Sequence, residues 1–237
     1  AYQNHFDVGS GLVAYYTTST ALVPKETYEY ARLQLDASGN LLSLFNKAMR
    51  SDEYGSRLIW NTPYSQYIRT ELTLGKTFVF GKNGGQAFAM RFLGGVGYAY
   101  GNSSTIPFEK QFYSGGANSM RGWQARALGP GSAKADTTFV IPSQTGDLKI
   151  EANLEYRFPM FWKLRGALFM DAGNIWTLKE TDGDDGAHTH FTLKNLTTSI
   201  AANWGLGLRV DLNFLILRLD MGMKIHDPSQ DTARWRS

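Results

Sequence analysis

The sequence contains no cysteine, which excludes a disulfide framework and a zinc–thiolate site. It also lacks a run of about 20 apolar residues of the kind that a membrane-spanning helix needs. The longest candidate, Phe214 to Leu217, is interrupted by Arg218 and Asp220. The chain does not open with a basic segment followed by an apolar one, so no signal peptide is expected within it. A helical membrane protein and a disulfide-stabilised domain are therefore excluded.

Neither sign of charge predominates, because 24 basic residues are interspersed with 21 acidic ones and the net charge is only +3. Without a basic stripe, we expect no nucleic-acid partner. The sequence has no Gly-x-Ser-x-Gly elbow, and no histidine belongs to a catalytic motif, so we expect no catalytic residues and no enzyme. His188 and His190, near three aspartates, lack EF-hand spacing and an ordered third ligand. No metal and no cofactor are expected.

What the sequence does contain is alternation of apolar and polar residues with period two. From Leu148 to Phe158 the even positions are apolar, whereas the odd positions from Lys149 to Arg157 are charged or carry an amide. Across the six clearest segments, one phase has a single charged residue, Lys76, among 39 positions, and the other has 14 among 35. Lys76 lies near a segment end, where a lysine can reach an interface. Charge is thus excluded from one face of each segment.

The alternating segments predict about eight antiparallel strands joined by connections of two lengths. Short connections lie at 81–85, at 159–163 and near Asn213. Long ones cover 38–66, 101–146, 177–198 and the run from 227 onward. Tight turns at one end and long loops at the other are typical of outer-membrane barrels. The predicted strands are Val8–Thr18, Thr27–Ala37, Tyr67–Phe80, Ala87–Tyr100, Leu148–Phe158, Leu164–Trp176, Ile200–Leu212 and Leu217–Ile225.

A soluble β-sandwich or a lipocalin-like barrel also alternates, and sequence does not show which face is the inner one. Two features favour a membrane barrel. Most segments are longer than the ~5–6 residues typical of soluble strands. Aromatic residues also lie near the segment ends, as in the girdles at headgroup level. We therefore expect an all-β fold, a transmembrane antiparallel β-barrel, with girdle residues Phe78, Phe80, Tyr98, Tyr100, Phe158, Phe161, Trp162 and Trp176.

The loop at 101–146 contains the sequence Phe-Tyr-Ser-Gly-Gly-Ala-Asn-Ser-Met-Arg-Gly-Trp, from Phe112 to Trp123. It resembles the signature loop of the BamA/TamA superfamily, Gly-Gly-x-x-Ser-Val-Arg-Gly followed by an aromatic residue. Residues 154–159 and 168–176 resemble the two strands that follow this loop in the family. The resemblance covers about residues 66–226. Within this range the sequence is similar to the version of the family found in Bacteroidota.

The resemblance implies that residues 1–237 are part of an outer-membrane barrel, about 8 of 16 strands, with the sixth extracellular loop folded inward at about 101–146. The POTRA domains and the remaining strands would lie outside this chain. The implied function is insertion of outer-membrane proteins, or translocation of polypeptide, at the outer membrane of a Gram-negative bacterium. Implied partners are outer-membrane lipid, unfolded outer-membrane protein clients and periplasmic or lipoprotein accessory subunits. The alternatives are the barrel anchor of a patatin-like phospholipase and a passive pore.

An arginine that re-enters a lumen needs carboxylate partners, because an unpaired charge is costly in a partly desolvated space. The resemblance assigns this role to Arg121, and Glu155 and Asp171 match the family's acceptor positions on adjacent strands. Glu151, on the same strand face as Glu155, is expected to supplement them. The functional motif is Gly115, Gly116, Asn118, Ser119, Met120, Arg121, Gly122 and Trp123.

Two details of this site follow from residue type. Gly122 permits close backbone approach, and Trp123 is expected to pack beside the acid pair. The alternative is that Arg121 is an ordinary solvated loop arginine and that the acids balance other charges in the lumen. Arg157, Arg165 and Arg209 would then compete for them. The glycines at 94–97 and 205–207 are expected to let strands bend and to leave lumen room for the loop.

Overall fold

The computed structural model describes residues 4–21, 24–81, 85–134, 144–179, 189–212 and 215–230. Asp182, Asp184, Asp185 and His188, considered above as metal ligands, lie outside these ranges. Within them, no group of three or more histidine and acidic side chains is placed to hold a metal ion. No helix in the described ranges has the length and apolar character needed to cross a membrane.

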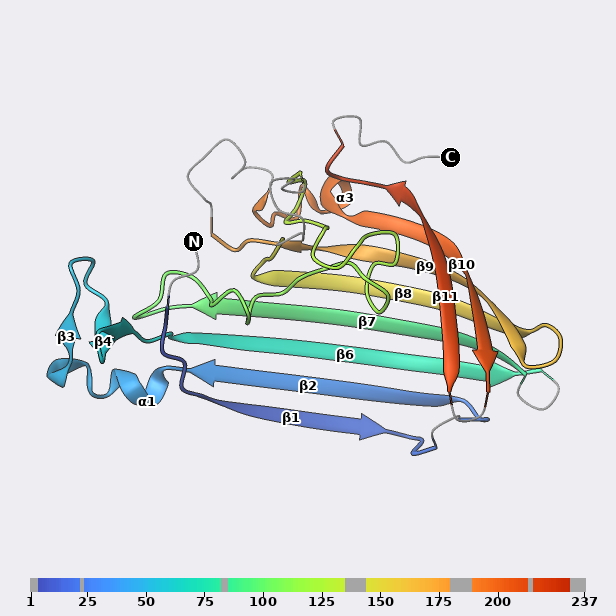
Figure 1. Cartoon of the computed structure of the whole chain (residues 1–237), viewed down its shortest axis with the longest axis horizontal. Coiled ribbons are helices and arrows are strands. Elements are labelled where there is room, and N and C mark those ends of the chain that lie inside the picture. The colour runs from blue at the N-terminus through green and yellow to red at the C-terminus, as the bar shows by residue number, and fades with distance from the viewer. Residues whose placement is uncertain are drawn as a thin grey trace.

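Eight strands form one antiparallel sheet, in which each strand pairs with its neighbour along the chain (Figure 1). The prediction of eight strands is confirmed, and every predicted boundary agrees with the structure to within one residue. The order β1-β2-β6-β7-β8-β9-β10-β11 is a simple meander, which short turns favour. The strands are β1 (Gly9–Thr17), β2 (Tyr28–Ser38), β6 (Tyr67–Phe80), β7 (Gln86–Ala99), β8 (Leu148–Pro159), β9 (Leu164–Trp176), β10 (Ala201–Asp211) and β11 (Ile216–His226).

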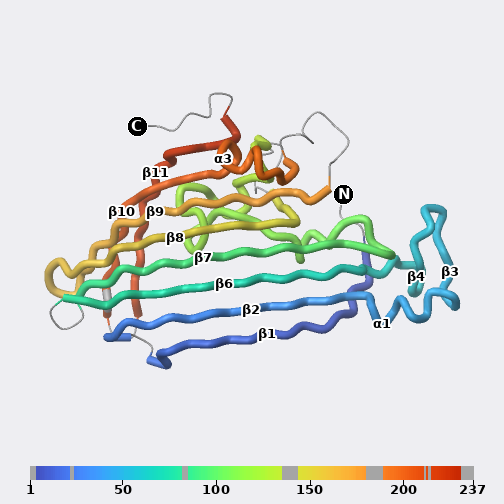
Figure 2. Tube along the Cα trace, turned by 180° about the vertical axis from the view of Figure 1, so that it is seen from behind, coloured from blue at the N-terminus to red at the C-terminus, as the bar shows by residue number. Residues whose placement is uncertain are grey.

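The sheet is curved and open, as expected for part of a barrel. β10 and β11 turn away from the plane of β6 and β7, and the described part of the segment between β7 and β8 lies across the sheet (Figures 1 and 2). β1 and β11 each pair with one strand only among the described residues. The short connections gather at one end of the strands and the long ones at the other (Figure 1). The alternating connection lengths therefore correspond to two different ends of one curved wall.

The apolar phase of the strands faces outward. Many of its large side chains are exposed, from 37% for Leu72 to 70% for Leu219. The opposite phase carries buried acids, among them Glu151 and Asp171, which are both 0% exposed. An exposed apolar face over six adjacent strands, β6 to β11, is far larger than the patches that soluble monomers tolerate. The direction that the sequence left open is thus the one expected of a lipid-facing barrel.

Residues 38–66, expected only as a long loop, contain regular structure that projects from one end of the sheet (Figure 1). A three-stranded antiparallel sheet forms there, with Trp60 and Asn61 in left-handed conformations at its tight turn. The turn matches the positive φ values that short hairpins require. The elements are α1 (Asn40–Ser43), η1 (Asn46–Ala48), β3 (Arg50–Ser51), β4 (Arg57–Ile59) and β5 (Thr62–Pro63).

The prediction that Trp176 belongs to an aromatic girdle is wrong. Trp176 is 1% exposed, and its indole Nε1 donates a hydrogen bond to Ser199 Oγ at 2.9 Å. Its ring meets Phe191 edge-on, with 5.4 Å between the centroids. The segment that leads into α3 (Leu196–Ser199) therefore covers this end of β9. Five other girdle candidates are exposed, including Phe161 at 69% and Trp162 at 79%, whereas Tyr100 and Phe158 are half-buried.

Two glycines of β7 make room for the long loop, as predicted. An added Cβ at Gly95 would lie 2.5 Å from the Phe112 ring, and one at Gly97 would lie 2.5 Å from Ile106. Gly205, in contrast, leaves room for Phe169 of the neighbouring strand. Gly207 leaves room for charged side chains of β10 and β11 rather than for the loop. The prediction of room for the loop holds for Gly95 and Gly97 and is wrong for Gly205 and Gly207.

Candidate functional site

The glycine-rich start of the motif folds the loop into a compact turn. Gly115 and Gly116 adopt φ values of 99° and 95°, which favour glycine. An added Cβ at Gly115 would lie 2.0 Å from the carbonyl oxygen of Gln124. The Gly116 N–H donates to the Trp123 carbonyl at 2.9 Å, so the two ends of the motif are joined. This closure presents residues 117–121, the loop tip, to the sheet.

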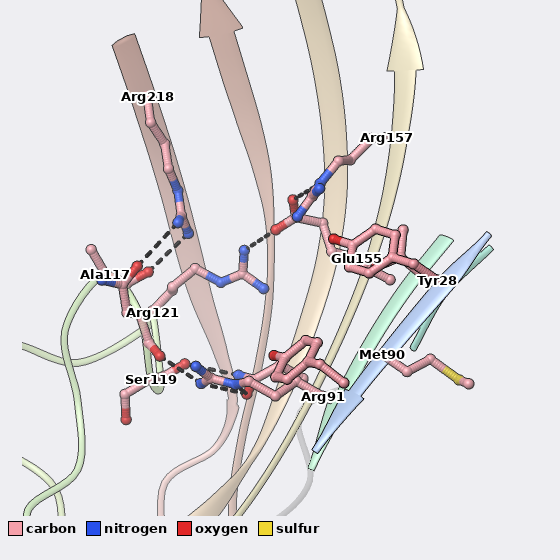
Figure 3. Close-up of a pocket in the computed structure, with 14 residues that line it drawn as sticks. Tyr28, Met90, Arg91, Ala117, Ser119, Arg121, Glu155, Arg157 and Arg218 are labelled. Carbon is pink, nitrogen blue, oxygen red and sulfur yellow. Dashed lines mark hydrogen bonds and ion pairs between the residues drawn. The ribbon is translucent and has the colours of Figure 1, made fainter. Parts of the chain in front are cut away.

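Arg121, at the end of the loop tip, binds acids on two adjacent strands. Its Nε and Nη2 donate to the two carboxylate oxygens of Asp171 at 2.9 and 2.7 Å. Its Nη1 donates to Glu155 Oε2 at 2.5 Å, the contact drawn in Figure 3. The Arg121 side chain is 6% exposed, and its guanidinium carbon lies 3.6 Å from the Phe169 ring centroid. A bidentate, charge-assisted contact of this kind is strong and directional.

Glu155 divides its two oxygens among three guanidinium groups. Oε2 accepts from Arg121, whereas Oε1 accepts from Arg157 Nε at 2.7 Å and Arg209 Nη2 at 2.8 Å. Two of the three expected competitors therefore share Glu155 with Arg121. Arg165, the third, is exposed and forms no ion pair within the described residues.

Glu151 does not supplement the Arg121 contact, contrary to expectation. Its carboxylate accepts hydrogen bonds from the hydroxyl groups of Ser114, at 2.7 Å, and Ser119. It also pairs with Lys149 Nζ at 3.1 Å. Four residues separate Glu151 from Glu155, about 13 Å along an extended strand, which is too far for one guanidinium to span. Glu151 instead holds the serine side of the motif.

The contact of Arg121 with Glu155 and Asp171 forms a clamp, and the apolar residues of the motif pack together beside it. Met120 is 0% exposed and Trp123 7%, and both belong to a buried cluster with Leu128 and Ala201. Lys224 Nζ lies 4.9 Å from the Trp123 ring centroid. Close approach to the wall requires Gly122, because an added Cβ there would lie 2.8 Å from the Asn203 Cβ.

Two arginines that the sequence did not single out bind the loop tip from its flanks. Arg91 of β7 donates from Nη2 to the Asn118 carbonyl at 2.5 Å. Arg218 of β11 donates from Nη2 to the Ala117 carbonyl at 2.8 Å and from Nη1 to Asn118 Oδ1 at 3.3 Å. Both lie on the charged phase of their strands, the one signal that could have found them. Figure 3 shows Ser119 beside Arg91 and Ala117 beside Arg218, with Arg121 between them. The loop tip is thus hydrogen-bonded to side chains of four strands, β7, β8, β9 and β11. Gly122, just after the tip, lies against Asn203 of β10.

Comparison with known proteins places this loop in a family context. The family model of the Omp85 superfamily domain matches residues 53–236. The outer membrane protein assembly factor BamA of Neisseria meningitidis serogroup B (strain ATCC BAA-335 / MC58) is 33% identical over 118 residues, 47% of this chain and 15% of that protein. This chain therefore corresponds to a small part of its curated relative. BamA from Haemophilus ducreyi lacking POTRA domains 1-3 is 15% identical with a TM-score of 0.47, over 92% of this chain and 51% of that one.

Proposed function

Because this chain belongs to the Omp85 superfamily, we propose that it helps to insert β-barrel proteins into the bacterial outer membrane or to move polypeptide across it. The protein lies in that membrane, where the exposed apolar phase of its strands meets lipid. Residues 1–237 would be part of the barrel, completed by further strands and preceded by POTRA domains elsewhere in the protein. Residues 101–146 would be its inward-folded loop.

The observation that carries the proposal is the clamp formed by Arg121 with Glu155 and Asp171. A loop that occupies part of the lumen and is bonded to several strands of one wall supports this function over that of an open, passive pore. Some barrels must change shape at one place and stay rigid at another. In such a barrel a docked loop would keep one wall rigid. The contacts of the loop tip, buried around Arg121 and exposed at Arg91 and Arg218, are suited to that role, because together they resist deformation of β7 to β11.

The proposed mechanism uses sheet pairing. An unpaired strand edge presents a row of N–H and C=O groups to which a client strand can add. Opening such an edge in a barrel changes the curvature of the whole sheet unless part of it is braced. Here the docked loop would brace β7 to β11, so that the change is confined to other strands. Unfolded outer-membrane proteins would be the clients, with periplasmic or lipoprotein accessory subunits as partners.

The test is Arg121→Ala in the full-length protein, reconstituted in lipid vesicles. We expect the folded barrel to lose its resistance to heat during electrophoresis and to insert a client barrel more slowly. Arg165→Ala is the matched control, since Arg165 is an exposed arginine on β9 that no acid binds within the described residues. Identical behaviour of the two variants in both assays would refute the proposal. Ion conductance that rises in Arg121→Ala with insertion unchanged would favour a pore.

A further inference from the structure

Two asparagines flank Asp171 in a single row across the sheet. Asn153 of β8 and Asn203 of β10 are the registered partners of Asp171 on β9. Asn153 Nδ2 donates to Asp171 Oδ1 at 2.8 Å, and Asn203 Nδ2 donates to Oδ2 at 2.9 Å. Asp171 and Asn203 are both 0% exposed. Each oxygen of the carboxylate is therefore bonded from within the sheet as well as by Arg121 from the loop.

The geometry of the carboxylate depends on these two amides. The terminal torsion of an aspartate is broad, so its carboxylate plane can rotate easily when nothing fixes it. Arg121 needs one particular plane, because its backbone N–H and Nε reach Oδ2 while Nη2 reaches Oδ1. An amide donor on each side fixes that plane before the loop arrives. This is the arrangement that lowers the entropy lost on binding.

We propose that Asn153 and Asn203 are positioning residues that orient the Asp171 carboxylate for Arg121, and that Asn203 does so through its N–H donor alone. The inference rests on the proposed role of the loop as an anchor. It assigns a function to two neutral residues outside the signature motif that form no hydrogen bond with Arg121 in the described part of the chain. Asn153 Nδ2 also donates to the Ser119 carbonyl of the loop tip at 2.9 Å.

The two asparagines differ on their acceptor side. Asn153 Oδ1 accepts from Arg91 Nε at 3.0 Å and from Nη2 at 2.8 Å. Asn203 Oδ1 is buried and has no hydrogen-bond partner within the described part of the chain. A carboxylate at either position would lie against Asp171. One at 153 would also have the Arg91 guanidinium as a partner, whereas one at 203 would be buried without a partner for its second oxygen. The pair thus offers a matched comparison of the same substitution at two positions.

Asn203→Asp converts the donor into a group that donates only when protonated. At acidic pH the new carboxyl can donate O–H to Asp171 as the amide did. At alkaline pH two buried carboxylates in contact repel each other. The charged or titratable groups that face position 203 are Asp171 on β9, Arg121 on the loop, and Lys224 and His226 on β11. The wild-type profile is measured alongside as the reference.

The experiment follows a spin label on the loop tip of the full-length protein in lipid vesicles. Ala117→Cys provides the site, because Ala117 is exposed and this chain contains no cysteine; cysteines elsewhere in the protein are replaced by serine. The label should be immobile in the wild-type background from about pH 5 to about pH 8, the range of histidine titration. With Asn203→Asp it should be immobile at the acidic end and mobile at the alkaline end. Asn203→Ala should be mobile throughout, and Asn153→Asp should show a smaller mobile fraction than Asn203→Asp.

An immobile label in Asn203→Asp at every pH would overturn the inference. So would a label that is mobile at every pH in a barrel that still resists heat, because the protonated carboxyl should replace the amide. Arg121→Ala separates this failure from failure of the proposed function. If the label stays immobile in Arg121→Ala, the anchor itself is wrong. If it becomes mobile there and Asn203→Asp does not respond to pH, only the positioning role is wrong.

Discussion

The inner wall of the sheet has two regions with the same alternating sequence but different partners. On β2 and β6 the charges pair with each other: Arg32 Nη1 with Glu71 at 3.2 Å, and Arg69 Nη2 with Glu71 at 2.8 Å. The Arg32 side chain is 38% exposed. On β8 and β9 the acids are buried, and their partner Arg121 comes from the loop, 50 residues before Asp171 in the sequence. The first network is complete within the sheet, whereas the second requires the loop.

The difference shows that alternation indicates which face is polar but not what the polar groups do. An ion pair that stays partly in water contributes ~0–1 kcal/mol. Removing one partner of a buried pair costs ~3–5 kcal/mol, because it leaves the other charge uncompensated. Substitutions in the two regions should therefore differ in cost even though the residue types and spacing are the same.

The largest effect is expected for Asp171→Ala. It leaves the buried Arg121 guanidinium without its bidentate partner, at a cost of ~3–5 kcal/mol. The heat midpoint, which is the temperature at which the folded barrel changes its electrophoretic migration, should fall markedly. Trypsin should cut after Arg121 in the folded protein. If Asp171→Ala resists heat and trypsin as well as Arg165→Ala does, the contact does not hold the loop.

A smaller effect is expected where the loop backbone touches the wall at Gly222. An added Cβ there would lie 2.8 Å from the Arg121 carbonyl oxygen, so Gly222→Ala must displace the loop. Overpacking of this kind costs ~1–3 kcal/mol. The matched control is Gly94→Ala, whose Cβ would meet only the Phe92 ring, 3.4 Å away. The same heat midpoint for both variants would argue against close docking.

A still smaller effect is expected on the other wall, for Glu71→Ala. Its pairs with Arg32 and Arg69 are partly exposed, so the loss should be ~0–1 kcal/mol. High salt should reduce the difference from wild type further, because exposed charges are screened. The heat midpoint at low and high salt measures both effects. A loss as large as that of Asp171→Ala would remove the distinction between the two regions.

The smallest effect concerns Asp147, just before β8, where burial raises the pKa of the carboxyl above its usual value. A carboxyl with a raised folded-state pKa destabilises the fold above that pKa, and the penalty disappears as pH falls. Asp147→Asn keeps the acceptor for the Leu178 N–H, which lies 3.2 Å from Asp147 Oδ2. Heat midpoints should favour the variant slightly at neutral pH and should converge on acidification. If the heat midpoint of the wild type rose relative to that of Asp147→Asn as pH increases, the expected direction of the effect would be contradicted.

Much of the fold was predictable because period two is a local property of the sequence. All eight strands and their ends followed from it. The apolar phase could not be assigned to the outside, since alternation is the same for a soluble and a membrane barrel. Trp176 was misassigned because the segment that covers it, around Phe191, has no periodic pattern of its own. The small sheet at 50–63 was missed because its strands are too short to alternate.

The candidate site was only partly predictable. The charged phase and the resemblance together pointed to Arg121, Glu155 and Asp171, which the structure brings into contact. Glu151 was misplaced although its distance from Glu155, about 13 Å along one strand, excludes a shared guanidinium. Its partners Ser114 and Ser119 could not be foreseen, because the path of a loop cannot be read from spacing. Asn153 and Asn203 were overlooked because a neutral amide on the polar phase carries no distinguishing signal. Only the register of three strands brings them to either side of Asp171.

The central claim is that Arg121 and Asp171 act as one unit that fixes the loop to the wall. A double-mutant cycle in the full-length protein, with Arg121→Ala and Asp171→Ala alone and together, tests it through the heat midpoint of the folded barrel. The double variant should be no less stable than Asp171→Ala alone, because removing Arg121 also removes the uncompensated charge. Additive losses from the two substitutions would show that the residues act independently and would contradict the anchor.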